Sequence, residues 1–129
     1  MSHFTTIKTE VRDLDALHDA CAEMGIELLP EIRCRGYGGT NRTAHRIIRL
    51  KGPYDIAVDE SESGDGSFAL TTDWWGGHVE KEVGAGYCRL LQGYGVHITL
   101  REARSRGLRA ARRLEADGSI LLTLEGGAL

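Results

Sequence analysis

Short apolar runs with a period of two residues dominate the middle of the chain. Ala44, Ile48 and Leu50 alternate with polar residues, and the same alternation recurs through residues 54–58 and 68–72. Turn-forming residues separate these runs, including an acidic, glycine-containing stretch, DESESGDG. A period of two with short connections is typical of consecutive antiparallel strands. The sequence therefore predicts a three-stranded antiparallel meander.

A helix with one apolar face is predicted just before this meander. Its apolar side chains recur at helical spacing, and they are Leu14, Leu17, Cys21 and Met24. Asp13 is placed to cap the amino end, and Gly25 is placed to end the helix. We expect the apolar face of this helix to pack on the sheet.

The period becomes helical again after residue 77. The apolar residues that share this face are Val79, Val83, Tyr87, Leu90, Leu91 and Tyr94. Glycine in a helix interior costs roughly 1 kcal/mol relative to alanine, so Gly93 and Gly95 predict a break in this helix. Thr99 and Glu102 have the form of a capping box, which predicts a further short helix that Gly107 ends.

The remaining segments are predicted to be extended or looped. Residues 3–11 and 26–33 are predicted strands, residues 35–43 a glycine-rich loop, and residues 108–125 a hairpin that turns at Asp117-Gly118. Helices against such strands predict an α+β fold, a two-layer sandwich of a mostly antiparallel sheet with helices packed on one face. No repeat or linker divides the sequence, so we expect a single domain over residues 1–129.

Composition narrows the class of protein. Hydrophobic residues make up 41% and charged residues 27%, which fits a globular protein. The net charge of −3 gives no global positive charge for nucleic acid. No apolar run has the about twenty residues of a membrane span, and no signal peptide core is present, so we expect a cytoplasmic protein. The cysteines are expected to be reduced core residues: Cys21, Cys34 and Cys88.

A glycine-rich string supplies the first candidate binding residues, Arg35, Tyr37, Gly38 and Gly39. Glycines allow left-handed turns whose backbone N–H groups can face an anion. No Gly-Lys-Ser/Thr follows, so the string does not match a phosphate-binding P-loop. The alternative is a turn that needs unusual dihedral angles and binds nothing.

The string DWWG supplies the second set, Asp73, Trp74 and Trp75. Adjacent residues at a strand end point in opposite directions, so one tryptophan can fill the core while the other faces outward. An exposed tryptophan beside glycines suits a hot spot for a protein partner. The alternative is that both rings cap the edge of the sheet.

The histidines are scattered and give no metal-ligand signature, so we expect neither a metal nor a cofactor. His97 is nevertheless a candidate, because folding can bring it close to Tyr37, Asp73 and Trp75. Those four residues would then line the pocket of a small ligand-binding or enzymatic domain.

Charge is concentrated in two segments. Six arginines fall between Arg101 and Arg113, and acids gather between Asp55 and Asp65. The guanidinium groups of these arginines can bind the phosphates of a nucleic acid, although no aromatic residue lies among them. We expect the two segments to lie on separate faces and so to orient a charged partner. Surface ion pairs between them are the alternative.

Six blocks in order along nearly the whole chain are similar to one protein family. They are MSHFTTIKT (1–9), RGYGG (35–39), YDI (54–56), DWWG (73–76), Gln92-x-Tyr94-x-x-His97 and DGSI (117–120). On these blocks the chain resembles the uncharacterised family named for hypothetical chloroplast open reading frame 35, with plastid, cyanobacterial and bacterial members. The resemblance implies no reaction. It implies a AAA+-type ATPase as a candidate partner, because bacterial members are often encoded beside one.

The leading hypothesis is a non-enzymatic binding or adaptor protein that acts through a protein partner. It rests on the missing catalytic signature, the outward-facing tryptophan and the resemblance. The small ligand-binding or enzymatic domain and the nucleic-acid-binding protein remain as alternatives.

Overall fold

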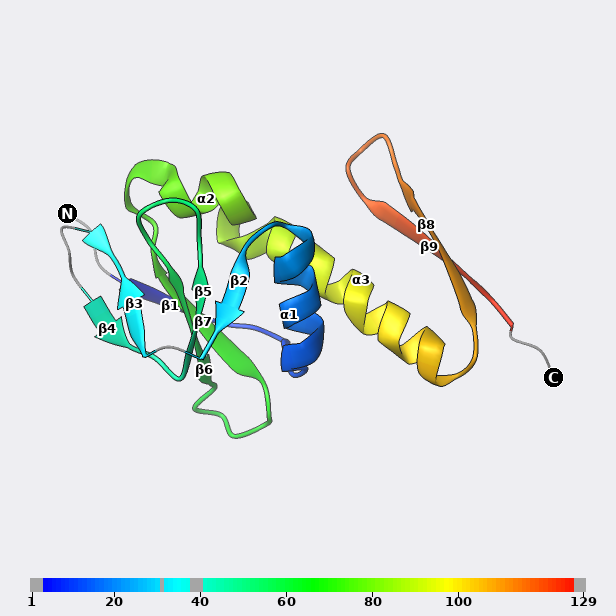
Figure 1. Ribbon diagram of the computed structural model, residues 1–129, viewed down its shortest axis with the longest axis horizontal. Coiled ribbons are helices and arrows are strands. Elements are labelled where there is room, and N and C mark those ends of the chain that lie inside the picture. The colour runs from blue at the N-terminus through cyan, green and yellow to red at the C-terminus, as the bar shows by residue number, and fades with distance from the viewer. Residues whose placement is uncertain (1–3, 31, 38–40, 127–129) are drawn as a thin grey trace.

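The computed structural model describes residues 4–30, 32–37 and 41–126. Its main sheet is antiparallel, with the strand order β1-β7-β6-β5-β2. These strands are β1 (Phe4–Lys8), β7 (Phe68–Asp73), β6 (Ile56–Glu60), β5 (Arg46–Arg49) and β2 (Glu27–Leu29). Two hairpins lie outside this sheet, and they are β3 (Arg33–Arg35) with β4 (Asn41–Thr43) and β8 (Arg109–Leu114) with β9 (Ile120–Glu125) (Figure 1). The helices are α1 (Leu14–Glu23), α2 (His78–Val83) and α3 (Cys88–Ser105). The predicted α+β fold is confirmed.

The main core lies between one face of the sheet and all three helices. Alternate residues of β5, β6 and β7 face the helices, as the period of two predicts, and the meander β5-β6-β7 is confirmed. The fully buried strand residues of this core are Ile48, Ile56, Val58 and Leu70. Leu17 and Cys21 of α1, Val79 and Val83 of α2, and Leu90 of α3 complete it.

The opposite face of the sheet carries a second, smaller core that the sequence did not predict. The β3–β4 hairpin covers part of this face, and its Cys34 packs with Ala44, Ile47 and Ala57. The predicted strand over residues 26–33 is confirmed only for Glu27–Leu29, which forms β2, and its continuation to residue 33 in the same strand is wrong. The chain leaves the main sheet after Leu29, next to Pro30, and Ile32 is 64% exposed. Part of the predicted glycine-rich loop is β3 and β4.

Helix α1 begins and ends where the sequence predicts. The Asp13 side chain accepts hydrogen bonds from the backbone N–H groups of Asp15 and Ala16, at 2.9 and 3.2 Å. Gly25 follows the helix with a φ of 74°, a conformation that glycine adopts without strain.

The break in the second helical region lies earlier than predicted. Gly84, with φ 85° and ψ 162°, separates α2 from α3, and Tyr87 is also left-handed with a φ of 67°. Helix α3 then continues through Gly93 and Gly95. Thr99 lies inside α3 and donates to the Gly95 carbonyl at 3.0 Å, so it is not a cap. No described helix is both long and apolar enough to cross a membrane.

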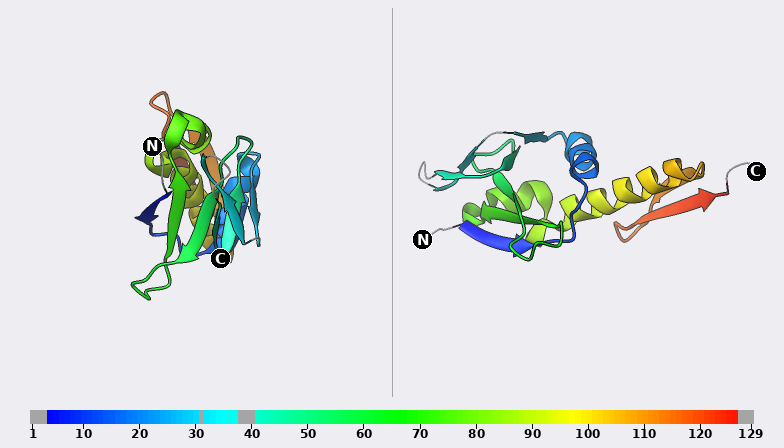
Figure 2. Two further views of the ribbon diagram at one scale, coloured as in Figure 1. Left: turned by 90° about the vertical axis from the view of Figure 1, so that its left-hand side faces the viewer. Right: turned by 90° about the horizontal axis from the view of Figure 1, so that it is seen from below.

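The predicted C-terminal hairpin is confirmed, and it projects from the rest of the molecule. Figures 1 and 2 show β8 and β9 beside the far half of α3, beyond the sheet and α1. Gln92 of α3 donates to the Gly118 carbonyl at 3.0 Å, and Arg112 of β8 donates to Glu23 of α1 at 2.8 Å. Every residue of β8 is exposed.

The three cysteines do not share one environment. Cys21 and Cys34 are fully buried, which raises the pKa of each thiol to about 12, whereas Cys88 is exposed. The prediction that all three are core residues is therefore wrong for Cys88.

We expect one thiol per folded chain to react within minutes with a disulfide reagent such as Ellman's reagent at pH 8, and three after unfolding in guanidinium. Cys88→Ser should remove the fast phase; a fast phase that persists in this variant would contradict the assignment.

Candidate functional site

Asp73, at the end of β7, holds two separate segments of the chain together. Its side chain is almost completely buried, and its residue is 3% exposed. Oδ2 accepts a hydrogen bond from the Tyr37 backbone N–H at 3.1 Å, and Oδ1 accepts one from the Trp75 N–H at 3.0 Å. Hydrogen bonds from backbone N–H groups satisfy a buried carboxylate. Asp73 therefore positions Tyr37 and Trp75 next to each other.

The rings of Tyr37 and Trp75 form an exposed pair, which we call the aromatic patch. Their centroids are 4.7 Å apart with an interplanar angle of 58°, a favourable tilted geometry. Both residues are 45% exposed. Trp74 takes the opposite direction, packs against the main core and lies 4.8 Å from the Tyr87 ring. The predicted division of the two tryptophans, one in the core and one outward, is thus what the structure contains.

Tyr54 and His78 lie close to the aromatic patch. Their rings meet edge to face at 5.2 Å, and Tyr54 is nearly buried. Desolvation, with the Asp73 carboxylate and Tyr37 nearby, raises the pKa of Tyr54. Further aromatic side chains therefore border the patch.

Arg35, a predicted binding residue, is engaged in an internal ion pair. Its Nε and Nη2 donate to the two oxygens of Asp55, at 3.0 and 2.8 Å, and its Nη2 also donates to the Gly52 carbonyl at 3.0 Å. Asp55 is completely buried, and Arg49 lies 3.1 Å from it. Gly36 lies under the Phe4 ring, where an added Cβ would be 2.7 Å from the ring. Gly38 and Gly39 lie outside the described residues.

His97 lies on a different part of the molecule from the aromatic patch, where it contacts Glu23. It lies in α3, and its Nε2 is 2.9 Å from Oε1 of Glu23 in α1. Arg112 binds the other oxygen of Glu23 at 2.8 Å, and Arg112, followed by His97, lowers the pKa of Glu23. The structure thus brings together Tyr37, Asp73 and Trp75 but engages His97 with Glu23. Glu23 was not predicted as a partner, because nothing in the spacing of these residues links α1, α3 and β8.

The ion pairs found in the two charged segments join neither segment to the other. In the arginine segment, Arg101 binds Asp19 at 2.7 Å and lowers the pKa of that carboxyl. Further pairs in this segment are Arg106–Glu102, Arg109–Glu125, Arg112–Glu23 and Arg113–Glu115. In the acidic segment, the pairs are Asp55 with Arg35 and Arg49, Asp59 with Arg42, and Asp65 with Lys8 and Arg12.

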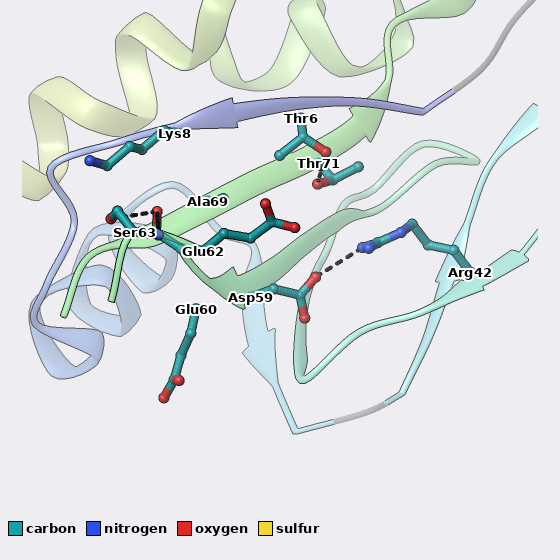
Figure 3. A pocket seen from close by; sticks show the side chains of 10 residues that line it. Thr6, Lys8, Arg42, Asp59, Glu60, Glu62, Ser63, Ala69 and Thr71 are labelled. Carbon is teal, nitrogen blue, oxygen red and sulfur yellow. Dashed lines mark hydrogen bonds and ion pairs between the residues drawn. The ribbon is translucent and has the colours of Figure 1, made fainter. Parts of the chain in front are cut away.

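A groove of about 550 Å³ lies on the sheet face away from the helices, beside the β3–β4 hairpin (Figure 3). Thr6 and Thr71 share a hydrogen bond of 2.8 Å on its floor, and Arg42 binds Asp59 at 3.0 Å on its wall. The remaining lining residues are Lys8, Glu60, Ser61, Glu62, Ser63 and Ala69. Sequence reasoning missed this groove because four separate segments contribute to it. Within the described residues, no three His, Cys, Asp or Glu side chains are grouped to hold a metal ion.

Comparison with known proteins places the chain in a family. Residues 20–123 match the family described as Protein of unknown function (DUF1257). The chain belongs to the DUF1257 family. This match runs from the last turn of α1 into β9, and it includes the aromatic patch, the β3–β4 hairpin and most of the β8–β9 hairpin. No curated protein and no solved structure matches the chain significantly.

Proposed function

We propose that this DUF1257 protein is a non-enzymatic binding protein that engages a protein partner through the aromatic patch. The observation that carries the proposal is the exposed Tyr37–Trp75 pair, fixed in place by a buried aspartate. Tyrosine and tryptophan are enriched at interface hot spots because they bury a large area with few rotatable bonds. Asp73 fixes the backbone at both members of the pair, so the two rings are ordered before a partner binds. This lowers the entropic cost of binding.

The partner that we propose is a AAA+-type ATPase encoded beside the protein, and the adaptor role follows from that partnership. This choice rests on the resemblance to the family of hypothetical chloroplast open reading frame 35, and membership of that finer family is part of the proposal. A cytoplasmic location is part of the same proposal.

The two alternative functions have less support. In a ligand-binding or enzymatic site, Asp73 would have to meet a substrate, but both of its oxygens accept backbone N–H groups and it is 3% exposed. His97 would complete that site, but it is bound to Glu23. For nucleic acid, five of the six arginines in the segment are paired with carboxylates.

Replacing Trp75 should weaken partner binding and leave the fold intact. We expect Trp75→Ala to reduce the affinity for the neighbouring ATPase at least about 30-fold, because truncating a hot-spot residue costs about 2 kcal/mol or more. The measurement is calorimetric titration of the purified ATPase with each variant, with thermal unfolding of each variant as a check.

Ile32→Ala is the matched control, since Ile32 is a 64% exposed apolar residue outside the aromatic patch. It should bind as the parent protein does. Equal affinities for Trp75→Ala and Ile32→Ala would overturn the role of the patch, and absence of binding by the parent protein would overturn the choice of partner.

A further inference from the structure

The β8–β9 hairpin exposes apolar side chains that the rest of the described chain leaves uncovered. Leu114 is 72% exposed, Leu121 44% and Leu124 42%. Helix α3 is the main element that the hairpin contacts. A two-stranded hairpin is only marginally stable by itself in water. The register places Leu114 and Leu124 on one face of the hairpin and Leu121 on the other. Apolar side chains exposed on both faces of such a hairpin indicate a segment that association covers.

Among the described residues, the outer edge of β9 pairs with no other strand. The Glu115 N–H donates to the Ser119 carbonyl at 2.8 Å, so these two facing residues form a hydrogen-bonded pair. Hydrogen-bonded and non-hydrogen-bonded pairs alternate along an antiparallel ladder. The register therefore makes Ile120, Leu122 and Leu124 members of non-hydrogen-bonded pairs. Their N–H and C=O groups point away from β8, toward the open edge.

The β9 edge lacks the features that normally protect an edge strand. Residues 120–124 are Ile-Leu-Leu-Thr-Leu, with no charge and no proline. Natural sheets protect their edges with charged residues, proline, bulges or very short strands. In this protein β2 has only three residues, β1 ends at Lys8, and β8 carries three arginines. The β9 edge is therefore the one best suited to pair with another strand.

We propose that β9 pairs antiparallel with β9 of a second copy of this chain, across a two-fold axis at Leu122. The residues whose backbone groups point toward the open edge then face each other. Leu122 lies opposite Leu122 of the second copy, and Ile120 lies opposite Leu124 of the second copy. Glu125, the one charged residue of β9, faces Ser119 of the second copy, so no like charges meet. No such neutral, symmetric pairing is open to β8, because its arginines would approach one another.

The resulting sheet has four strands in the order β8-β9-β9-β8, and its outer strands do not favour the addition of a third copy. Each outer strand carries Arg109, Arg112 and Arg113, which discourage the addition of further strands. A two-fold contact of one surface with itself produces a dimer and not a fibre. The leucines of both hairpins become neighbours in this sheet.

Sedimentation equilibrium of the purified chain tests the proposal. The parent protein should contain two chains per particle. Leu122→Pro removes an outward N–H that the hairpin itself does not use, so we expect this variant to contain one chain. Ala110→Pro makes the equivalent change on the β8 edge and should still contain two. A parent protein with one chain, a dimeric Leu122→Pro variant or an open-ended polymer would overturn the proposal.

Crosslinking provides a second test that does not depend on proline. Thr123→Cys, in a Cys88→Ser background, places one exposed thiol on β9, near Thr123 of the second copy. A short bismaleimide should join two such chains. Thr99→Cys in the same background places a thiol on α3 and should remain uncrosslinked. Equal crosslinking of both variants, or of neither, would contradict pairing through β9.

Discussion

Asp55→Ala should lower the free energy of unfolding by about 3 kcal/mol, because it removes a completely buried carboxylate that accepts several charge-assisted hydrogen bonds from Arg35. Asp55 is completely buried and binds Arg35 at 2.8 Å and Arg49 at 3.1 Å. Its Oδ2 also accepts the Arg35 backbone N–H at 3.0 Å. The substitution therefore also removes one hydrogen bond that joins β3 to residue 55, although the backbone bond from the Asp55 N–H to the Arg35 carbonyl remains. Urea denaturation followed by circular dichroism measures the loss.

Asp59→Ala is the control for this substitution. Asp59 also pairs with an arginine, Arg42, at 3.0 Å, but it is partly exposed. Partly exposed ion pairs contribute only about 0–1 kcal/mol, so we expect a loss within that range. If the two variants lost equal stability, burial would not be the reason for the importance of Asp55.

Gly84→Ala should be about as damaging, with an expected loss of about 3 kcal/mol from backbone strain and overpacking together. Gly84 has φ 85° and ψ 162°, a conformation that is essentially confined to glycine. An added Cβ would lie 2.5 Å from Cys88 Sγ and 3.0 Å from the Arg89 backbone nitrogen. The first turn of α3 would have to move. Thermal and urea unfolding measure the effect.

Gly95→Ala makes the same chemical change at a place where glycine has no structural role. Gly95 lies inside α3, and an added Cβ there has no neighbour within 4 Å. Alanine is favoured over glycine in a helix interior by about 1 kcal/mol, so this variant should gain stability. Opposite signs for Gly84→Ala and Gly95→Ala are the expected result. A loss of stability in both would mean that the break at Gly84 does not explain the effect.

The elements that the sequence predicts well are those in which local pattern and tertiary packing agree. The helix over Leu14–Glu23 has a cap, an apolar face and a terminating glycine, and each of them does in the structure what its chemistry suggests. The meander and the Asp117-Gly118 turn follow for the same reason. The helix break was misplaced because intrinsic propensity suggested Gly93 and Gly95. In the structure the helix break lies at Gly84 instead, where tertiary packing requires a positive φ.

The candidate site was predictable in part. Strand alternation predicts opposite directions for Trp74 and Trp75. The structure contains this division, but it arises in a helical turn, because β7 ends at Asp73 and Trp75 begins a 3-10 helix. Asp73 as the residue that joins Tyr37 to Trp75 needed the third dimension, because 36 residues separate it from Tyr37. The same limit applies to Arg35, whose salt bridge to Asp55 spans 20 residues. Spacing along a sequence gives no sign of such contacts.

The second core, under the β3–β4 hairpin, has a consequence for motion. Within the described part of the chain it contains four buried residues, Cys34, Ala44, Ile47 and Ala57, far fewer than the main core, and so it contributes less to stability. Segments with few buried contacts open locally at a lower free energy than the whole molecule. Tyr37 lies two residues after the end of β3, so each opening of this hairpin dismantles the aromatic patch. A partner that binds the patch selects the closed hairpin, and its affinity is reduced by the fraction of time that the hairpin spends open.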